Sequence, residues 1–290
     1  MPKLVWLNGE IMPLESAVVP AADHAHLYGD GLFEGIRIYN GKIFKLDEHL
    51  KRLYHGIAYL GFEMRMKQSE LKQTIIEVCA RAQIQDGYIR LNVTRGTGLG
   101  LDPKNINRSP NVMIMVNALS LYSADAYEIG LNVVTTSLRV IPPDALDPRV
   151  KAIGRYVANI LAKQEANRQG AGEGLMLNAQ GYVAECTGDN IFLIKDRIIR
   201  TPHPSSGILQ GITRDTVIML AREKGYTVEE GFLTPYDVHA ADEAFLTGTA
   251  AEVIPMITLD NRMIGCGKPG EITQILMDAF REHTKIGTSF

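Results

Sequence analysis

The sequence has few cysteines, and no pattern joins them. Cys79, Cys186 and Cys266 lie far apart in the 290 residues, and none belongs to a CxxC or Cys/His ligand spacing. A disulfide framework and a metal site are therefore not expected. No run of about eighteen residues is apolar, and the first residues show no secretory signal. We expect a cytoplasmic protein that holds no metal and does not enter a membrane.

The sequence also has little excess of one sign of charge over the other. Thirty Lys and Arg residues against thirty-three Asp and Glu residues give a formal net charge of −3. This balance provides no basic field for a polyphosphate backbone, so nucleic acid is not an expected partner. Hydrophobic residues make up 46% of the chain and charged residues 22%, as in ordinary globular proteins. The length is sufficient for about two domains.

Several common catalytic signatures are missing. The patterns GxxxxGK[ST], GxSxG and HExxH do not occur, which removes the main signals for P-loop, serine-hydrolase and zincin chemistry. Gly96-Thr97-Gly98-Leu99-Gly100 follows an expected strand but does not have the GxGxxG spacing. Asp102-Pro103 then stands where the helix of a dinucleotide-binding motif would begin. Dinucleotide binding is therefore not expected either.

Local patterns predict an α/β (α+β) chain in two unequal lobes. Asn8-Gly9 and Asn40-Gly41 predict tight hairpins, because both residues tolerate the positive φ angles of such turns. Residues 88–95 alternate between apolar and polar side chains, so one face of that strand is expected in the core and the other could line a site. The expected domains are a small N-terminal domain at 1–118, a linker without regular structure at 119–128 and a large domain at 129–290. The expected helices are 46–60, 69–82, 154–168, 211–221 and 272–280, and the further strands are 4–7, 33–39, 42–45, 112–119, 131–140, 175–177, 182–185, 191–194, 244–246 and 253–257.

Two turns in the second lobe are suited to an anion. Gly211-Ile212-Thr213 stands at an expected helix start, where free backbone N–H groups and the positive end of the helix dipole favour a phosphate. Thr247-Gly248-Thr249-Ala250-Ala251 is a small, hydroxyl-bearing turn at a strand end. Each of these turns alone is also typical of an ordinary cap or turn. Lys151 follows the break at Pro142-Pro143 and precedes a helix.

Six segments together match one known family in their order along the chain. They are Tyr28-Gly29-Asp30-Gly31-Leu32-Phe33-Glu34-Gly35-Ile36-Arg37, Tyr88-Ile89-Arg90, Lys151 with Tyr156, Glu185 ahead of Asp189-Asn190-Ile191-Phe192, Gly211-Ile212-Thr213-Arg214, and Thr247-Gly248-Thr249-Ala250-Ala251-Glu252. On these residues the chain resembles the branched-chain amino-acid aminotransferases, which are class IV aminotransferases and fold type IV pyridoxal-phosphate enzymes. The resemblance implies a smaller N-terminal α/β lobe, a larger C-terminal lobe with a pseudo-barrel sheet, and pyridoxal 5'-phosphate as cofactor.

The resemblance implies a role for each cofactor-binding residue. Lys151 would form the Schiff base with pyridoxal phosphate and move the proton at the substrate Cα. Glu185 would pair with the pyridine nitrogen, and Tyr156 would bind the 3′ oxygen. Leu209 would pack on the ring, and the remaining residues would bind the phosphate. The implied cofactor-binding residues are Arg52, Lys151, Tyr156, Glu185, Leu209, Ile212, Thr213 and Thr249.

The resemblance also implies a substrate site. The substrate α-carboxylate is expected at Ala250-Ala251, helped by Tyr88, while Arg90 would bind the distal carboxylate of 2-oxoglutarate or glutamate. Leu101 would close an apolar side-chain pocket from the partner subunit, so a homodimer or a higher homo-oligomer is expected. The implied substrate-binding residues are Tyr28, Phe33, Gly35, Arg37, Tyr88, Arg90, Leu101, Ala250 and Ala251.

The expected reaction is transamination of leucine, isoleucine or valine with 2-oxoglutarate, giving branched 2-oxo acids and L-glutamate. The alternatives are a D-amino-acid or (R)-amine transaminase, an aminodeoxychorismate lyase, and a cofactor-independent binding protein of the same two lobes. Thr94-Arg95-Gly96 is similar to the region of D-amino-acid transaminases that binds the carboxylate. Arg155 stands where the family commonly has Asn, and its role is left open.

Overall fold

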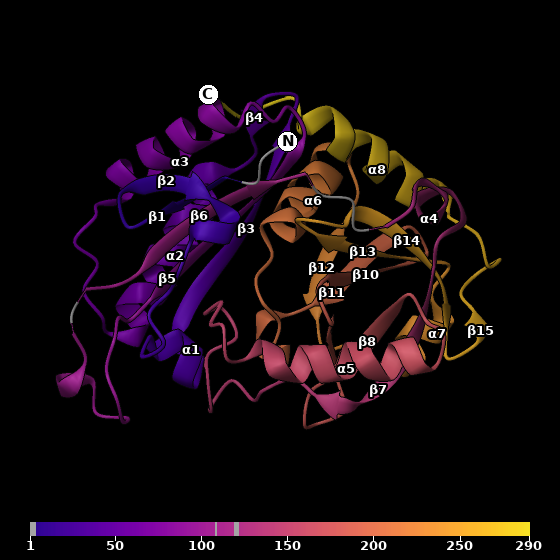
Figure 1. Ribbon diagram of the computed structural model, residues 1–290. Helices are drawn as coiled ribbons and strands as arrows, with labels where there is room; N and C mark the ends of the chain where they lie inside the picture. Colours follow the sequence, from indigo (N-terminus) through magenta and orange to yellow (C-terminus); the bar gives the residue numbers. More distant parts are fainter. Residues whose placement is uncertain (1–3, 108, 119–121) are drawn as a thin grey trace. The chain divides into compact units, whose positions relative to one another are not determined.

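The computed structural model describes residues 4–107, 109–118 and 122–290, and it divides the chain into two compact units (Figure 1). The first unit comprises the described residues of 1–119 together with 150–156 and 284–290. The second comprises the described residues of 120–149 together with 157–283. The sequence placed Lys151 in the large domain, and this assignment differs from the structure. Lys151 belongs to the first unit because its carbonyl accepts a hydrogen bond from the Phe33 N–H at 3.2 Å.

The first unit contains one antiparallel sheet of seven strands in the order β16-β4-β3-β5-β6-β1-β2. Both Asn-Gly turns have the expected positive φ angles, 50° at Asn8 and 48° at Asn40, and the predicted hairpins are confirmed. The elements of this unit are β1 (Leu4–Leu7), β2 (Glu10–Pro13), α1 (His24–Tyr28), β3 (Gly31–Tyr39), β4 (Lys42–Ile43), α2 (Leu46–Leu60), α3 (Gln68–Ala82), β5 (Gly87–Thr94), the 3-10 helix η2 (Pro103–Asn105), β6 (Val112–Asn117) and β16 (Thr288–Ser289).

The two long helices of the first unit cover one face of its sheet. Helix α2 packs on β3, and α3 packs on β1 and β6. Alternation along the strands sends Leu32, Ile36 and Leu91 into this core, where all three are fully buried. The opposite face therefore carries the polar set predicted for residues 88–95, together with Phe33 and Gly35 of β3.

The second unit contains a nine-stranded mixed sheet in the order β12-β11-β10-β13-β14-β7-β8-β9, with β15 paired to β14. Strand β9 also approaches β10 and β11, so the sheet curls on itself. The elements of this unit are α4 (Ala124–Ile129), β7 (Leu131–Arg139), α5 (Tyr156–Arg168, whose first residue is in the first unit), β8 (Glu173–Leu177), β9 (Val183–Cys186), β10 (Asn190–Lys195), β11 (Ile198–Pro202), α6 (Ile212–Glu223), β12 (Val228–Gly231), α7 (Pro235–Ala240), β13 (Glu243–Gly248), β14 (Glu252–Leu259), β15 (Arg262–Met263) and α8 (Glu271–His283).

The expected linker at 119–128 is partly helical. Residues 119–121 lie outside the described part of the chain, but Ala124–Ile129 form α4. Ala126 and Tyr127 pack against the hydrophobic core of the second unit, so tertiary contacts stabilise a helix that the local pattern does not predict. Among the described residues, no helix has the length and apolar character needed to cross a membrane.

Candidate active site

Lys151 lies in a small aromatic cluster of the first unit. Its Nζ donates a hydrogen bond of 2.8 Å to the Tyr156 hydroxyl and lies 4.5 Å from the centre of the Phe33 ring. The Phe33 and Tyr156 rings meet edge to face, with their centroids 4.8 Å apart. The main chain around Lys151 is fixed as well. The Phe33 N–H donates a hydrogen bond to the Lys151 carbonyl, and the Ile153 N–H donates one of 2.9 Å to the Gly31 carbonyl. The amine is therefore held by its main chain and by its side-chain contacts.

The sheet face beside this lysine carries a cation and a phenol. The Arg90 guanidinium carbon lies 3.7 Å from the centre of the Phe33 ring, a cation–π contact, and Arg90 Nε donates to the Asn92 side chain at 2.9 Å. Gly35 faces Arg90 across the strands, and a Cβ atom at Gly35 would lie 1.9 Å from the Tyr88 hydroxyl oxygen. Glycine is therefore required there for Tyr88 to reach over the strand. Burial raises the pKa of the Tyr88 phenol, which keeps it a hydrogen-bond donor.

Glu34 lies on the other face of β3, towards α2. Its carboxylate accepts two hydrogen bonds of 2.7 Å from Nε and Nη2 of Arg52, and its Oε2 lies 2.8 Å from His49 Nδ1. Burial alone would raise the pKa of Glu34, but the charge and hydrogen bonds of Arg52 and His49 lower it to about 2. Burial lowers the pKa of His49. Arg52 thus has a carboxylate partner within its own unit, and its role at a phosphate stays a prediction.

Of the remaining predicted residues of the first unit, Tyr28 and Leu101 lie at the loop that follows β5, whereas Arg37 lies towards the other end of β3, opposite Tyr88. Tyr28 Oη accepts a hydrogen bond of 3.2 Å from the Gly100 N–H, which ties α1 to this loop. The Leu101 side chain is 78% exposed. The Arg37 guanidinium carbon lies 4.9 Å from the centre of the Tyr39 ring. Leu101 therefore presents an apolar side chain at the surface of its unit, as a residue donated to another subunit would require.

Glu185 is the buried carboxylate that the sequence predicts in the second unit. Its Oε2 accepts hydrogen bonds from the Leu209 backbone N–H at 2.8 Å and from Asn190 Nδ2 at 3.3 Å. The same Asn190 nitrogen donates to the Leu209 carbonyl at 2.9 Å. Glu185 and Leu209 are therefore held together by two links, one direct and one through Asn190. The carboxylate is fixed on a strand and is suited to pair with a cationic ring N–H.

Helix α6 begins beside this carboxylate. Its N-cap is Gly211, and no side chain caps the helix, so the first-turn N–H groups of Ile212 and Thr213 have no side-chain acceptor there. A Cβ atom on Gly211 would lie 2.2 Å from Asn190 Oδ1, which explains why glycine stands at this position. Uncapped N–H groups at the positive end of a helix dipole fit a phosphate.

The turn that joins β13 to β14 approaches a buried carboxyl group. A Cβ atom on Gly248 would lie 2.0 Å from Asp189 Oδ1. Burial, followed by the negative charge of Glu173, raises the pKa of Asp189 to about 7. Within the described residues, the buried Thr247 hydroxyl has no hydrogen-bond partner. Thr249 and Ala250 are half-buried at the tip of this turn, while Ala251 is buried and its carbonyl accepts a 3.2 Å hydrogen bond from Tyr127.

Each unit thus gathers part of the predicted set. The first carries Lys151, Tyr156, Phe33, Gly35, Tyr88, Arg90, Arg52, Arg37, Tyr28 and Leu101, and the second carries Glu185, Leu209, Ile212, Thr213, Thr249, Ala250 and Ala251. Sequence reasoning gave no role to Glu34, His49, Asn190 or Asp189. The alternation of β3 was the available signal for Glu34, because it places that residue on the face opposite to Phe33. In the described ranges, no group of three or more His, Cys, Asp and Glu side chains could hold a metal ion.

Comparison with known proteins places these residues in a family context. Residues 31–258 match the model of the family described as amino-transferase class IV. The chain is 42% identical over 285 residues to a putative branched-chain-amino-acid aminotransferase of Methanocaldococcus jannaschii, covering 98% of this chain and 97% of that protein. It is 34% identical to the branched-chain-amino-acid aminotransferase of Escherichia coli K12, covering 95% of this chain and 91% of that protein. The structure is similar to the crystal structure of the branched-chain amino acid aminotransferase from Thermobaculum terrenum in its PLP form, with a TM-score of 0.88, 33% identity, and coverage of 98% of this chain and 94% of that one.

Proposed function

Because the chain belongs to the class IV aminotransferase family, we propose that it is a pyridoxal-phosphate-dependent branched-chain amino-acid aminotransferase. It transfers the amino group of leucine, isoleucine or valine to 2-oxoglutarate and produces the branched 2-oxo acid and L-glutamate. The observation that carries this proposal is the Lys151 amine, held 2.8 Å from the Tyr156 hydroxyl beside the Phe33 ring. The predicted fold type IV architecture agrees with the solved aminotransferase structures that this chain resembles.

Each unit contains donor and acceptor groups of the kinds that pyridoxal phosphate requires. The uncapped start of α6 and the Thr249 turn suit its phosphate, Glu185 suits its ring nitrogen, and Tyr156 suits its phenolic oxygen. Gly211 supports this fit, because any side chain there would displace Asn190 and so disturb the Glu185–Leu209 pair. When bound, pyridoxal phosphate accepts the amino group and withdraws electrons from the substrate Cα.

Lys151 is the base of the reaction. Its amine takes the proton from the substrate Cα and returns a proton in the second half of the cycle. Tyr156 holds the amine in place through the 2.8 Å hydrogen bond, and the Phe33 ring limits its freedom on another side. Precise placement of a general base is worth several orders of magnitude in rate.

Substrate recognition combines anion binding with an apolar wall. Arg90 and the Tyr88 phenol bind carboxylate groups of the substrates, together with the backbone of Ala250 and Ala251. The pocket for the substrate side chain is lined by Phe33, Tyr28 and Gly35. Arg37 lies on the same strand as Phe33 and Gly35. Leu101 enters this pocket from the partner subunit of a homodimer, consistent with its exposure in its own unit. We place the enzyme in the cytoplasm, and we assign most of the substrate binding to residues of the first unit and most of the cofactor binding to residues of the second.

Removal of the amine tests the proposal most directly. Lys151→Ala should abolish the visible absorbance band of the cofactor and lower the rate with L-leucine by about 10²–10⁴-fold. Lys195→Ala is the matched control, because Lys195 is exposed and paired with Asp242, and it should retain both the band and the rate. An unchanged band in Lys151→Ala would contradict the assignment of the lysine.

Substrate handedness needs a separate measurement. Adding L-leucine to the holoenzyme should remove the visible band, whereas D-alanine and (R)-phenylethylamine should leave it. In the structure, Arg95 forms a fork with Asp30 through Nε and Nη2 at 2.5 and 3.1 Å, which commits two of its nitrogens. A response to D-alanine alone would assign the chain to the D-amino-acid transaminases instead.

A further inference from the structure

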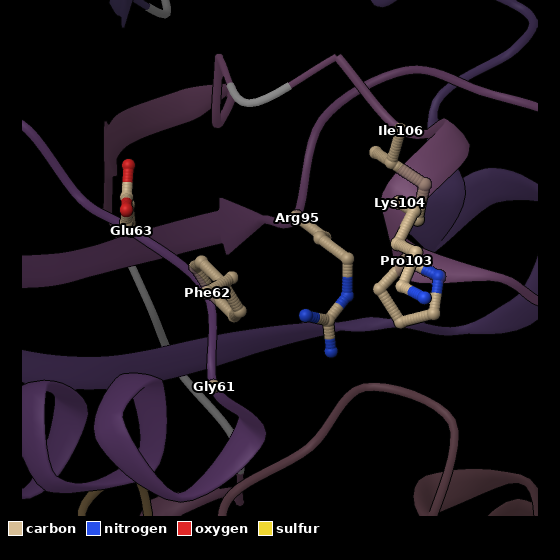
Figure 2. A pocket seen from close by; sticks show the side chains of 7 residues that line it. All are labelled: Gly61, Phe62, Glu63, Arg95, Pro103, Lys104 and Ile106. Carbon is tan, nitrogen blue, oxygen red and sulfur yellow. The ribbon is translucent and has the colours of Figure 1, made fainter.

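A pocket of about 240 Å³ lies in the first unit, and none of its lining residues belongs to the proposed substrate or cofactor site. It is formed by three segments: residues 61–63 after α2, Arg95 directly after β5, and η2 with the Ile106 that follows it (Figure 2). The pocket therefore lies at the base of the loop that carries Leu101. Its lining combines basic, aromatic and aliphatic side chains with one acidic residue, Glu63.

Arg95 presents part of its guanidinium to this pocket in a fixed orientation. Nε and Nη2 bind Asp30, and Nη2 also donates to the Leu60 carbonyl at 3.0 Å. Burial would raise the pKa of Asp30, but hydrogen bonds from Arg95 and His24 lower it, so this carboxylate stays ionised and keeps its hold on Arg95. Among the described residues, Arg95 Nη1 has no hydrogen-bond partner. One N–H-bearing nitrogen of a pre-oriented cation is therefore available to an acceptor.

A second cation and an apolar wall complete the pocket. Lys104 lines the same pocket as Arg95 and forms no ion pair with any described residue (Figure 2). The Phe62 ring centre lies 5.2 Å from the Arg95 guanidinium carbon. Pro103 and Ile106, the latter only 5% exposed, add aliphatic surface. In the view of Figure 2, Glu63 lies beyond Phe62 as seen from Arg95.

We propose that this pocket is a second binding site, separate from the active site, for a small organic carboxylate with a short apolar chain. The carboxylate binds Arg95 Nη1 and the Lys104 ammonium group, and the chain packs against Phe62, Pro103 and Ile106. The volume suits a chain of a few carbon atoms. That the physiological ligand is one of the enzyme's own oxo or amino acids rests on the proposed function. The site itself rests on the first unit alone.

The position of the pocket couples it to the loop. Asp30 bridges Arg95 to His24 Nδ1 at 2.7 Å, and His24 Nε2 contacts the Gly100 carbonyl at 3.0 Å. These contacts hold the loop at Gly100. Lys104 lies in η2, which follows Gly100 in the chain. A carboxylate that draws Lys104 towards Arg95 therefore holds the loop at its other end as well. Occupancy should order the loop that bears Leu101.

Local protection of Lys104 tests the proposal. The holoenzyme is treated with an amine-acylating reagent while 4-methylpentanoate is added at constant ionic strength, and the modified lysines are quantified by mass spectrometry. Acylation of Lys104 should slow in a saturable manner, whereas Lys51, an exposed lysine of the same unit, should react unchanged. Acetate should protect much more weakly, because each buried methylene contributes about fourfold in affinity. Equal protection by acetate, or no protection by 4-methylpentanoate, would overturn the proposal.

Variants of the apolar wall separate this site from the active site. Phe62→Ser should raise the concentration for half-protection of Lys104 by about tenfold, while Phe62→Leu should keep it within about threefold. Occupancy of the active site is followed separately through the cofactor absorbance, and its curve should be the same in both variants. If the concentration for half-protection of Lys104 equals that for half-occupancy of the active site, and neither Phe62 variant changes it, there is no second site. A failure of the proposed function appears elsewhere, as the absence of a response to L-leucine.

Discussion

Two buried carboxyl groups, one in each unit, show how differently the same side-chain chemistry can be tuned. Glu34 is 0% exposed and Asp189 is 6% exposed, yet the pKa of Glu34 is about 2 and that of Asp189 about 7. Burial acts in the same direction on both. The difference comes from the neighbours: two basic side chains surround Glu34, whereas Asp189 lies among other carboxylates. Charge environment, not depth, decides which buried acid is ionised at neutral pH.

The acidic environment of Asp189 is built by the strands of the second unit. Glu173 at the start of β8 accepts a hydrogen bond from the Thr187 hydroxyl and one of 2.6 Å from the Gly174 N–H, and Lys163 Nζ lies 3.7 Å from its other oxygen. These partners hold the Glu173 carboxyl group in place within the same cluster. A further charge on Asp189 costs energy, because Glu173 and Glu185 both repel it. Below about pH 7, Asp189 therefore keeps its proton at pH values where Glu34 has already lost its own.

The largest expected effect comes from breaking the Glu34 cluster. Glu34→Gln leaves Arg52 facing a neutral group, so the free energy of unfolding at pH 7 should fall by about 3–5 kcal/mol. Urea denaturation of the purified protein measures this. Glu229→Gln removes the exposed partner of Arg200 and is the matched control, with an expected loss of at most about 1 kcal/mol. A loss of the same size in both variants would contradict the importance of burial around Glu34.

The same pair of clusters predicts opposite pH dependences. The pKa of Glu34 is lowered in the folded state, so its stabilising contribution is present above the unfolded value of 4.5 and is lost as the pH falls towards about 2. The pKa of Asp189 is raised, so it is neutral in the folded state and ionised in the unfolded state between 3.8 and about 7. Its contribution therefore becomes less favourable as the pH rises through that interval.

Asp189→Asn should reveal this second dependence. At pH 8 the variant should be more stable than the native protein by about 1–3 kcal/mol, because it removes a buried charge among carboxylates while keeping an acceptor oxygen. At pH 4.5 the two proteins should be equal within about 0.5 kcal/mol. Urea denaturation at both pH values measures the difference. A variant that is less stable at pH 8 would show that Asp189 is ionised and satisfied in the folded state.

The smallest expected effect compares two buried hydroxyl groups of the second unit. Thr201 Oγ1 donates to the Ile191 carbonyl at 2.8 Å, whereas the Thr247 hydroxyl has no partner among the described residues. Thr201→Val should therefore cost about 1–2 kcal/mol, and Thr247→Val should be neutral or slightly stabilising in the protein without cofactor. Thermal unfolding of the cofactor-free variants measures both. Equal losses would indicate that Thr247 is hydrogen-bonded after all.

The parts of this structure that the sequence predicts are those governed by local chemistry. The Asn-Gly hairpins follow from backbone preferences, and the half-buried polar face of β5 follows from its alternation. Strand β12 was missed because its residues are exposed or half-buried and show no apolar alternation. The Glu34–Arg52 pair depends on how α2 packs on β3, and no spacing along the chain encodes that packing.

The pairing of Lys151 with β3 determines which unit positions the lysine side chain. The chain enters the first unit at Val150 and leaves it after Tyr156. The seven residues between are therefore flanked in the sequence by two stretches of the second unit. Lys151, Tyr156 and the Phe33 ring therefore all belong to the first unit, and the hydrogen bond between the lysine amine and the phenol lies within that unit. Folding of this one unit therefore sets the lysine amine beside the phenol and the ring, although Phe33 and Lys151 lie far apart in the sequence.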